Sequence, residues 1–185
     1  MPFFMMNSST DKPELRRHLI AARRALPPDV KAQAHMRIAE RLLQWLERHQ
    51  VKTLAGFLPM AGEPDLSPLY AELPSRGIDL AMPVVLERHQ PLRFARWRPG
   101  DALTRDASGT MAPATRDDWL LPDAVLAPCI GYTDSKLRLG FGGGYFDRTL
   151  ALASRPKAVG IAYAFAKVSF AAEAHDIPLD EIITD

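Results

Sequence analysis

A glycine-rich stretch carries the strongest chemical signal in this sequence. Its residues are Arg138-Leu-Gly-Phe-Gly-Gly-Gly-Tyr-Phe-Asp-Arg148, with four glycines within five positions. Glycines place no side chain between the backbone and a ligand, so a row of amide N–H groups is free to face an anion. The pattern is neither a Walker A loop, which needs Lys followed by Ser or Thr, nor the dinucleotide fingerprint, which needs a glycine at position 145. The stretch predicts a phosphate-binding loop flanked by two arginines, with a structural turn as the alternative.

The segments on either side of this loop predict the elements that seat phosphates in α/β proteins. The apolar run 123–130 predicts a buried strand, and the run 148–153 predicts a helix. A helix N-terminus adds its own partial positive charge beside a bound anion. We therefore expect strand, glycine loop and helix to follow one another directly.

The first helix is predicted over residues 12–26. Asp11 and Glu14 have the spacing of a capping box, and leucines at 15, 19 and 26 recur at helical spacing. At roughly 100° per residue, three cations lie along one line beside the leucine stripe, and two point away from it. The inner set is Lys12, Arg16 and Arg23, and the outer set is Arg17 and Arg24. The inner cations are candidates for presenting charge to a site, with basic side chains that merely snorkel at a helix edge as the alternative.

Carboxylates stand at two further places that suit ligand binding. Glu63 follows the strand predicted over 53–58, and the carboxyl ends of strands carry the ligand-binding groups of open α/β sheets. Its candidate partner is a substrate N–H, and an acidic turn residue is the alternative. Asp176 lies in the C-terminal tail and would bind a cation if the fold returns it to the phosphate loop; otherwise it is a turn residue.

The remaining pattern predicts several short elements. A second helix is expected over 29–49, with a buried stripe at Ile38, Leu42, Trp45 and Leu46, and a short helix over 66–73. Further strands are expected over 78–85, 92–97 and 158–163, whereas the polar, proline-bearing segment 100–119 predicts a long surface loop. Cys129, at the end of the buried strand, is predicted to be a small buried hydrophobe.

Composition bounds the class of protein. The chain has 185 residues, a net charge of +1 and one cysteine, which excludes an internal disulfide framework. No run approaches the roughly 18 apolar residues of a membrane span, and residues 1–6 lack the basic start of a signal peptide. We expect a loose N-terminus over 1–10, a single domain over 11–185, a cytoplasmic location, no nucleic-acid or membrane partner, and a monomer or weak dimer.

Taken together, these residues resemble the 5-formyltetrahydrofolate cyclo-ligase family, also called methenyltetrahydrofolate synthetases. The resemblance runs from Lys12-Pro-Glu-Leu-Arg16 through Gly62-Glu63-Pro-Asp65 and the glycine stretch to His175-Asp176, and the glycine stretch is its most specific part. It implies an α/β fold of the kind shared with sugar-phosphate isomerases and CoA transferases. It also implies an ATP- and magnesium-dependent reaction in which 5-formyltetrahydrofolate becomes 5,10-methenyltetrahydrofolate.

The resemblance also implies roles for individual residues. Lys12 and Arg138 are the implied catalytic cations. The implied ATP-binding residues are Lys12, Arg16, Arg138, Leu139, Gly140, Phe141, Gly142, Gly143, Gly144 and Tyr145. Leu58, Glu63 and Tyr145 would lie against the folate, and Asp147 and Asp176 would hold Mg²⁺. Such a site needs no side-chain nucleophile, because phosphoryl transfer depends mainly on positioning and charge neutralisation.

Four positions depart from the family pattern. Phe141 and Phe146 stand where tyrosines are usual, and Thr133 and Lys136 replace a usual Asp and Gly. Stacking survives such changes, but roles that need a hydroxyl do not. Two alternatives stay open: a nucleotide-binding paralogue without cyclo-ligase activity, and a sugar-phosphate isomerase on the same fold. The acids at 63, 147 and 176 argue against the first, and the absence of an evident enolisation base argues against the second.

Overall fold

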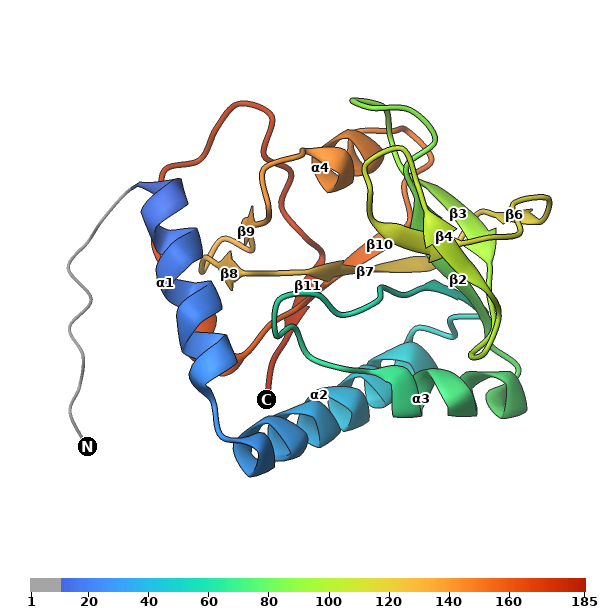
Figure 1. Cartoon of the computed structure of the whole chain (residues 1–185), viewed down its shortest axis with the longest axis horizontal. Coiled ribbons are helices and arrows are strands. Elements are labelled where there is room, and N and C mark those ends of the chain that lie inside the picture. The colour runs from blue at the N-terminus through green and yellow to red at the C-terminus, as the bar shows by residue number, and fades with distance from the viewer. Residues whose placement is uncertain (1–10) are drawn as a thin grey trace.

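A seven-stranded sheet forms the centre of the structure, a computed structural model that describes residues 11–185 (Figure 1). The strand order is β11-β10-β7-β1-β2-β3-β6. Strands from β11 to β2 run parallel to their neighbours, whereas β3 pairs antiparallel with both β2 and β6. The α/β prediction is thus confirmed at the level of a mainly parallel sheet with flanking helices. The segment 1–10, predicted to be loose, lies outside the described residues.

The strands are short, and five of the seven fall where apolar runs predicted them, whereas β6 and β11 were not predicted. Their bounds are β1 Thr53–Ala55, β2 Asp79–Val84, β3 Arg93–Arg96, β6 Trp119–Leu120, β7 Ala124–Pro128, β10 Lys157–Ile161 and β11 Glu181–Ile183. From β1 the chain adds β2 on one side, and the later strands β7, β10 and β11 on the other. The sheet therefore has a topological switch point between β1 and β7, which is where open α/β sheets bind ligands.

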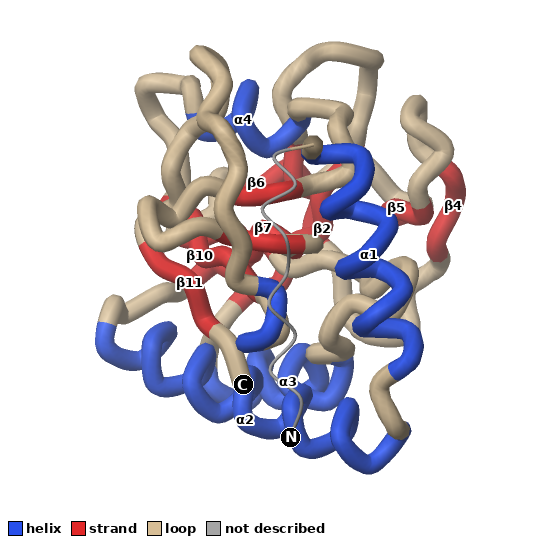
Figure 2. The backbone as a smooth tube through the Cα atoms, turned by 90° about the vertical axis from the view of Figure 1, so that its left-hand side faces the viewer, coloured by secondary structure: helices blue, strands red, loops and turns tan. Residues whose placement is uncertain are grey.

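Helices cover both faces of the sheet. Their bounds are α1 Lys12–Ala25, α2 Pro28–Arg48, α3 Ser67–Glu72 and α4 Tyr145–Leu150, with 3₁₀ turns at Leu73–Arg76 and Ala164–Ala166. Figure 1 shows α2 and α3 on one face and α4 on the other, and Figure 2 shows α1 upright beside the sheet. Because strand side chains alternate, Leu54 packs in the core with α2 and α3, and its neighbour Ala55 packs in the core with Leu150 of α4.

Helical periodicity predicted the two long helices well. The predicted stripe of α2 is buried in the main core. Leu15 and Leu19 of α1 are also buried, but in a separate cluster with Ile130 and Leu139. The capping box is wrong, because Asp11 occupies the N-cap without a side-chain cap hydrogen bond. Pro13 in the first turn, where its missing N–H costs nothing, is consistent with the helix starting here. No helix among residues 11–185 is both long and apolar enough to cross a membrane.

Three segments differ from the sequence prediction. The expected surface loop 100–119 contains a hairpin, in which β4 Leu103–Arg105 pairs antiparallel with β5 Met111–Pro113. A second hairpin, β8 Gly131–Tyr132 with β9 Arg138–Leu139, separates the buried strand from the glycine loop. The helix after the loop begins at Tyr145 rather than at Arg148. Strands of two or three residues give too little periodicity to be recognised in the sequence.

Candidate active site

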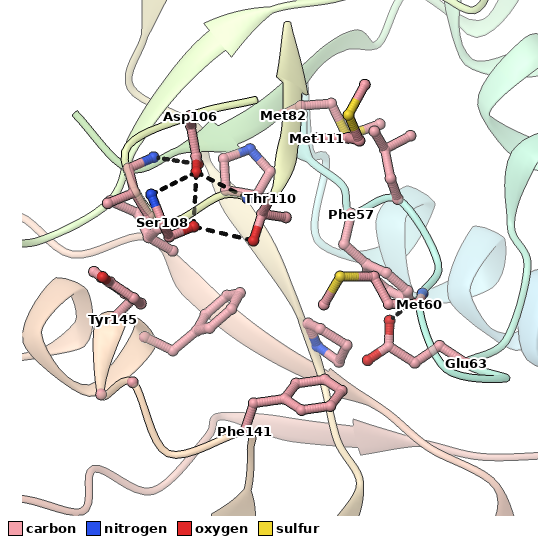
Figure 3. Close-up of a pocket in the computed structure, with 18 of the residues that line it drawn as sticks. Phe57, Met60, Glu63, Met82, Asp106, Ser108, Thr110, Met111, Phe141 and Tyr145 are labelled. Atoms are coloured by element: carbon pink, nitrogen blue, oxygen red, sulfur yellow. Dashed lines mark hydrogen bonds between the residues drawn. The ribbon is translucent and has the colours of Figure 1, made fainter. Parts of the chain in front are cut away.

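A pocket opens at the switch point, beyond the carboxyl ends of β1, β2 and β7 (Figure 3). Its volume is about 230 Å³. It is lined by Phe57, Leu58, Met60, Glu63, Met82, Pro83, Val85, Leu92, Asp106, Ser108, Thr110, Met111, Pro128, Arg138, Phe141, Gly142, Gly143, Gly144, Tyr145 and Phe146. Parallel strands end at one edge of a sheet, so the topology brings Leu58, Glu63, Arg138 and the glycine loop together, as the predicted site requires.

The walls of the pocket are mostly apolar, and some of them are exposed. Met60 is 41% exposed, Met111 is 42% exposed and Phe141 is 50% exposed. Figure 3 shows Met60, Met111 and Phe141 around the same cavity. Large apolar side chains gathered at a cavity in this way are typical of ligand-binding sites.

Glu63 is the buried acid of this pocket. It is 4% exposed, and its Oε2 accepts a hydrogen bond from the Met60 N–H at 2.9 Å. Its Oε1 has no hydrogen-bond partner and lies 3.8 Å from Nη2 of Arg23. Burial raises the pKa of the carboxyl, and the Met60 N–H with the Arg23 and Arg138 cations offset this rise only in part. Glu63 therefore contributes to the pocket lining a buried carboxyl in which one oxygen has no hydrogen-bond partner.

The glycine loop closes another side of the pocket. Gly142 and Gly144 have φ of 97° and 68°, a backbone conformation that residues other than glycine rarely adopt. Arg16 Nε donates to the Gly140 carbonyl at 2.6 Å, and Arg148 Nη1 donates to the Gly143 carbonyl at 2.7 Å. Within the described chain, the N–H groups of residues 141–144 make no hydrogen bond. With carbonyl oxygens held by arginines and N–H groups free, the loop has the character of an anion-binding nest.

Arg138 lies where the loop meets the pocket. Its guanidinium stacks 4.7 Å from the centre of the Phe146 ring, and Nη1 donates to the Pro128 carbonyl at 3.2 Å. A Cβ at Gly140 would overlap this guanidinium, so the glycine makes room for the arginine. Phe146 thus keeps a stacking role without a hydroxyl, as expected for its departure from the family pattern.

The cations of α1 divide as the helical geometry predicted. Lys12, Arg16 and Arg23 face the protein, whereas Arg17 and Arg24 are exposed. Lys12 Nζ forms ion pairs with Glu173 Oε1 at 2.9 Å and Asp176 Oδ2 at 3.0 Å, and does not line the pocket.

The pairing of Lys12 with Asp176 shifts both pKa values. Burial lowers the pKa of Lys12, but its hydrogen bonds to Glu173 and Asp176 outweigh this and raise it. Burial raises the pKa of Asp176, but hydrogen bonds from the Glu173 N–H and from Lys12 leave it lowered. Both partners are therefore held in their charged forms.

The tail also approaches the second predicted metal ligand. Asp147 Oδ1 accepts a hydrogen bond from the N–H of Ile177 at 3.0 Å, so this carboxylate lies against the backbone next to Asp176. Within residues 11–185, the one group of three possible ligand side chains comprises Glu173, His175 and Asp176, with ligand atoms within 4.8 Å of one another. Asp147 is not in that group, so this fold brings Asp147 and Asp176 into one region without forming a preassembled metal cage.

Sequence reasoning missed the hairpin that covers the pocket. Asp106 Oδ1 accepts hydrogen bonds from the N–H and hydroxyl of Ser108 and from the N–H of Thr110, and Oδ2 accepts one from the Val85 N–H (Figure 3). This ties the hairpin tip to the end of β2 and places two hydroxyls on the pocket wall. The signal was the turn sequence Asp106-Ala-Ser-Gly-Thr110, because Asp, Ser and Gly at this spacing favour a turn closed by the Asp side chain.

Four of the predicted ATP-binding residues do not line the pocket: Lys12, Arg16, Leu139 and Gly140. Leu139 is buried in the cluster beneath α1, and Gly140 makes room for Arg138. The pocket is mostly apolar, lies at the switch point of a mainly parallel sheet, and is bordered by the glycine loop and by Arg138. These features define an α/β ligand-binding protein suited to an apolar and an anionic group side by side.

Comparison with known proteins narrows this class. The chain belongs to the 5-formyltetrahydrofolate cyclo-ligase family, which matches residues 8–185. A 5-formyltetrahydrofolate cyclo-ligase of Mycoplasma pneumoniae is 30% identical over 179 residues, which are 95% of this chain and 99% of that protein. The 5-formyltetrahydrofolate cyclo-ligase of Escherichia coli (strain K12) is 28% identical, over 88% of this chain and 93% of that one.

The fold is also similar to solved structures of 5,10-methenyltetrahydrofolate synthetases. A 5,10-methenyltetrahydrofolate synthetase of Mycoplasma pneumoniae has a TM-score of 0.74 at 29% identity, covering 95% of this chain and 99% of the other. The 5,10-methenyltetrahydrofolate synthetase of Aquifex aeolicus has a TM-score of 0.78 at 28% identity, covering 93% of this chain and 88% of the other. The fold and the family therefore extend over nearly the whole chain.

Proposed function

We propose that this protein is an ATP-dependent 5-formyltetrahydrofolate cyclo-ligase that uses Mg²⁺. The reaction transfers the γ-phosphoryl group of ATP to the formyl oxygen, N10 attacks the activated carbon, and loss of phosphate gives 5,10-methenyltetrahydrofolate and ADP. The observation that carries the proposal is one apolar cavity lined both by Glu63, a buried acid with one unpartnered oxygen, and by the glycine loop, whose N–H groups make no hydrogen bond within the described chain. The first suits the N–H donors of a folate ring, and the second suits phosphate.

The residues of the site divide the work. Glu63 binds and orients the folate, with Leu58 and Tyr145 against its rings. The N–H groups of the loop, with Arg16, hold the phosphates, and Lys12 joins them by exchanging its carboxylate partners for phosphate oxygens. Arg138, between the two ends, neutralises charge where the phosphoryl group is transferred. Catalysis then comes from positioning and fixed charge, as phosphoryl transfer requires.

The carboxylates present fit a magnesium ion. Mg²⁺ prefers one or two carboxylates together with phosphate oxygens and water, and Asp147 Oδ2 makes no hydrogen bond within the described chain. Asp147 and Asp176 would hold the ion, which when bound neutralises phosphate charge. The Glu173–His175–Asp176 group is the competing location.

The direct test combines the purified protein with 5-formyltetrahydrofolate, ATP and Mg²⁺ and follows the absorbance of the methenyl product. We expect product only when ATP and Mg²⁺ are both present. A folded preparation that binds ATP without turnover across a range of reduced folates would support the nucleotide-binding paralogue instead. Isomerase activity on sugar phosphates without ATP would support the second alternative.

We propose that 11–185 is a single catalytic domain, that the protein works in the cytoplasm as a monomer or weak dimer, and that its partners are small molecules rather than nucleic acid. The likeness to sugar-phosphate isomerases and CoA transferases also remains a proposal, supported by the mainly parallel sheet and its switch point.

The inner cations of α1 should affect ATP use, and the outer ones should not. Lys12→Ala and Arg16→Ala are each expected to weaken kcat/KM for ATP by about 1.5–3 kcal/mol, because each loses a charge-assisted phosphate contact. Arg17→Ala and Arg24→Ala are matched controls on the same helix with exposed side chains. Steady-state kinetics at varied ATP measure the effect. Equal losses in all four variants would show that the helix acts through bulk charge or stability.

The two aspartates should share one ion. Asp147→Asn and Asp176→Asn are each expected to raise the Mg²⁺ concentration for half-maximal turnover by at least about tenfold, and the double variant should lose little more. Glu173→Gln is the matched control, because Glu173 also pairs with Lys12 but is not a proposed ligand. Mg²⁺ titrations of these variants, with thermal melts, measure the effect. Unchanged Mg²⁺ dependence would remove both aspartates from the site, and a Glu173→Gln effect equal to that of Asp176→Asn would move the ion to the Glu173–His175–Asp176 group.

A further inference from the structure

The buried side chain of Arg23 lies directly behind Glu63. Arg23 is 2% exposed and projects from α1 onto the turn that precedes Glu63. Its Nε donates to the Ala61 carbonyl at 2.7 Å, and its Nη2 donates to the Met60 carbonyl at 3.5 Å. The same Nη2 is 3.8 Å from Glu63 Oε1. One guanidinium therefore contacts both the backbone of the turn and the acid that the turn carries.

This pair is not closed as an ordinary buried salt bridge. Arg23 Nη1 and Glu63 Oε1 are both buried without a hydrogen-bond partner, although nearly all buried polar atoms have one. A buried ion pair is favourable only when its remaining polar atoms are satisfied, so this arrangement is costly in the free protein. Glu63, whose Oε1 the pair leaves without a hydrogen bond, is one of the residues that line the pocket.

The turn itself depends on support from outside. Ala61 has φ of 48°, in the left-handed region that is unfavourable for a residue with a Cβ, and Gly62 follows with φ of 80°. Arg23 holds the Ala61 carbonyl, and the Tyr163 hydroxyl donates to the Gly62 carbonyl at 3.3 Å. His35 Nε2 is hydrogen-bonded to the same hydroxyl at 2.9 Å. Side chains from α1, α2 and the end of β10 thus fix one strained turn.

We infer that Arg23 is a positioning residue of the folate site, which fixes the 60–63 turn and the Glu63 carboxylate that this turn places at the pocket, without touching the substrate. The inference rests on the proposed function, since it takes folate as the ligand of Glu63. Arg23 does not line the cavity, so its effect must pass through Glu63 and the turn.

Few other charges act on Glu63. The ionisable groups that interact with it are Arg23 of α1, Arg138 of β9, Tyr70 of α3, Cys129 after β7 and Tyr163 after β10. Burial raises the pKa of Cys129 and that of Tyr163 to about 12, and raises the pKa of Tyr70 as well, so all three are neutral near pH 7. The two arginines are therefore the charges that favour an ionised Glu63, and Arg23 contacts its turn directly.

The test measures binding of 5-formyltetrahydrofolate to the whole protein by calorimetry without ATP, together with steady-state kinetics. Arg23→Gln is expected to raise the Kd and the KM for the folate by about tenfold to hundredfold and to leave the KM for ATP within about twofold. Arg23→Lys keeps the charge but not the planar fork, so it should bind between wild type and Arg23→Gln. Arg17→Gln, an exposed position of the same helix, is the matched control and should bind as wild type does.

Two further readouts separate positioning from a structural role. The first readout is the pH at which folate binding weakens on acidification. This pH should be higher in Arg23→Gln than in wild type by about one unit or more, because loss of a nearby cation raises the pKa of an acid. In Arg23→Lys it should stay near the wild-type value, because the cation is kept. In a Glu63→Gln background, Arg23→Gln should reduce folate affinity by less than about threefold, since the two act on one contact.

The outcomes are distinguishable. If wild type binds and converts the folate but Arg23→Gln binds it normally, or if Arg23→Gln costs as much with Glu63→Gln as without it, the inference is wrong and the proposed function stands. If wild type neither binds nor converts the folate, both are wrong. Should Arg23→Gln fail to fold, Arg23→Lys and Tyr163→Phe carry the test: each should raise the KM for the folate several-fold and not that for ATP, and equal changes in both would overturn the inference.

Discussion

Replacing Arg138 with alanine is expected to reduce kcat/KM for methenyltetrahydrofolate formation by roughly two to three orders of magnitude, the effect of removing one preorganised charge partner from a transition state. Arg138 lines the pocket where it meets the glycine loop, and it is fixed by the Phe146 ring at 4.7 Å and by the Pro128 carbonyl at 3.2 Å. A cation already held in place stabilises charge that develops during phosphoryl transfer without further reorganisation. Steady-state assays of the methenyl product measure the loss.

Arg148→Ala is the matched comparison for Arg138→Ala. Arg148 also lies over an aromatic ring, that of Tyr145 at 5.7 Å, and also donates to a backbone carbonyl, that of Gly143. It does not line the pocket, so its loss should cost less than about tenfold, as for one ordinary hydrogen bond. Equal losses in the two variants would mean that both arginines act by holding the loop, and Arg138 would lose its catalytic role.

The parts of the fold that sequence predicted are those set by local periodicity. The apolar stripe of α2 and the separation of inner from outer cations on α1 follow from the angle between successive helical residues, and both agree with the structure. The position of Glu63 at the pocket was predicted in the same way, because Glu63 follows a predicted strand and the carboxyl ends of parallel strands carry ligand-binding groups. In each case a few neighbouring residues contain the necessary information.

The parts that sequence did not predict depend on contacts between distant segments. Lys12 pairs with Asp176, 164 positions away, and Asp147 is bonded to the backbone of Ile177, and no local pattern specifies either contact. The hairpin tip at Asp106 is tied to β2 through the Val85 N–H, which again only the fold reveals. The buried contact between Arg23 and Glu63 is likewise a contact between distant segments. Helical geometry predicted that Arg23 faces inward, but it could not predict which residue Arg23 contacts.

Glu63→Gln is expected to lower kcat/KM for 5-formyltetrahydrofolate by about two to three orders of magnitude, or roughly 3–4 kcal/mol, with the KM for ATP close to wild type. Glutamine keeps the shape of the side chain but loses the charge that makes its hydrogen bonds strong, and its amide can present a donor where the folate needs an acceptor. Kinetics at varied folate and varied ATP separate the two substrates. Equal increases in both KM values would contradict a role for Glu63 at the folate alone.

The same substitution should change how stability depends on pH, because Glu63 is buried at a cost. Burial raises its pKa above the ordinary value of 4.5, and a carboxyl whose folded pKa is raised stabilises the fold below that value and loses this contribution as pH rises through the folded pKa. Wild type therefore bears the cost of ionised Glu63 at neutral pH, and Glu63→Gln does not. The Arg23 cation left unpaired by the substitution destabilises the variant, but equally at every pH, because arginine stays charged throughout. We expect the Tm of Glu63→Gln to rise relative to that of wild type between about pH 4 and about pH 8, measured by thermal melts in matched buffers. A Tm difference that stays constant over this range would show that Glu63 ionises with its ordinary pKa, and that burying its carboxylate carries no cost to the fold.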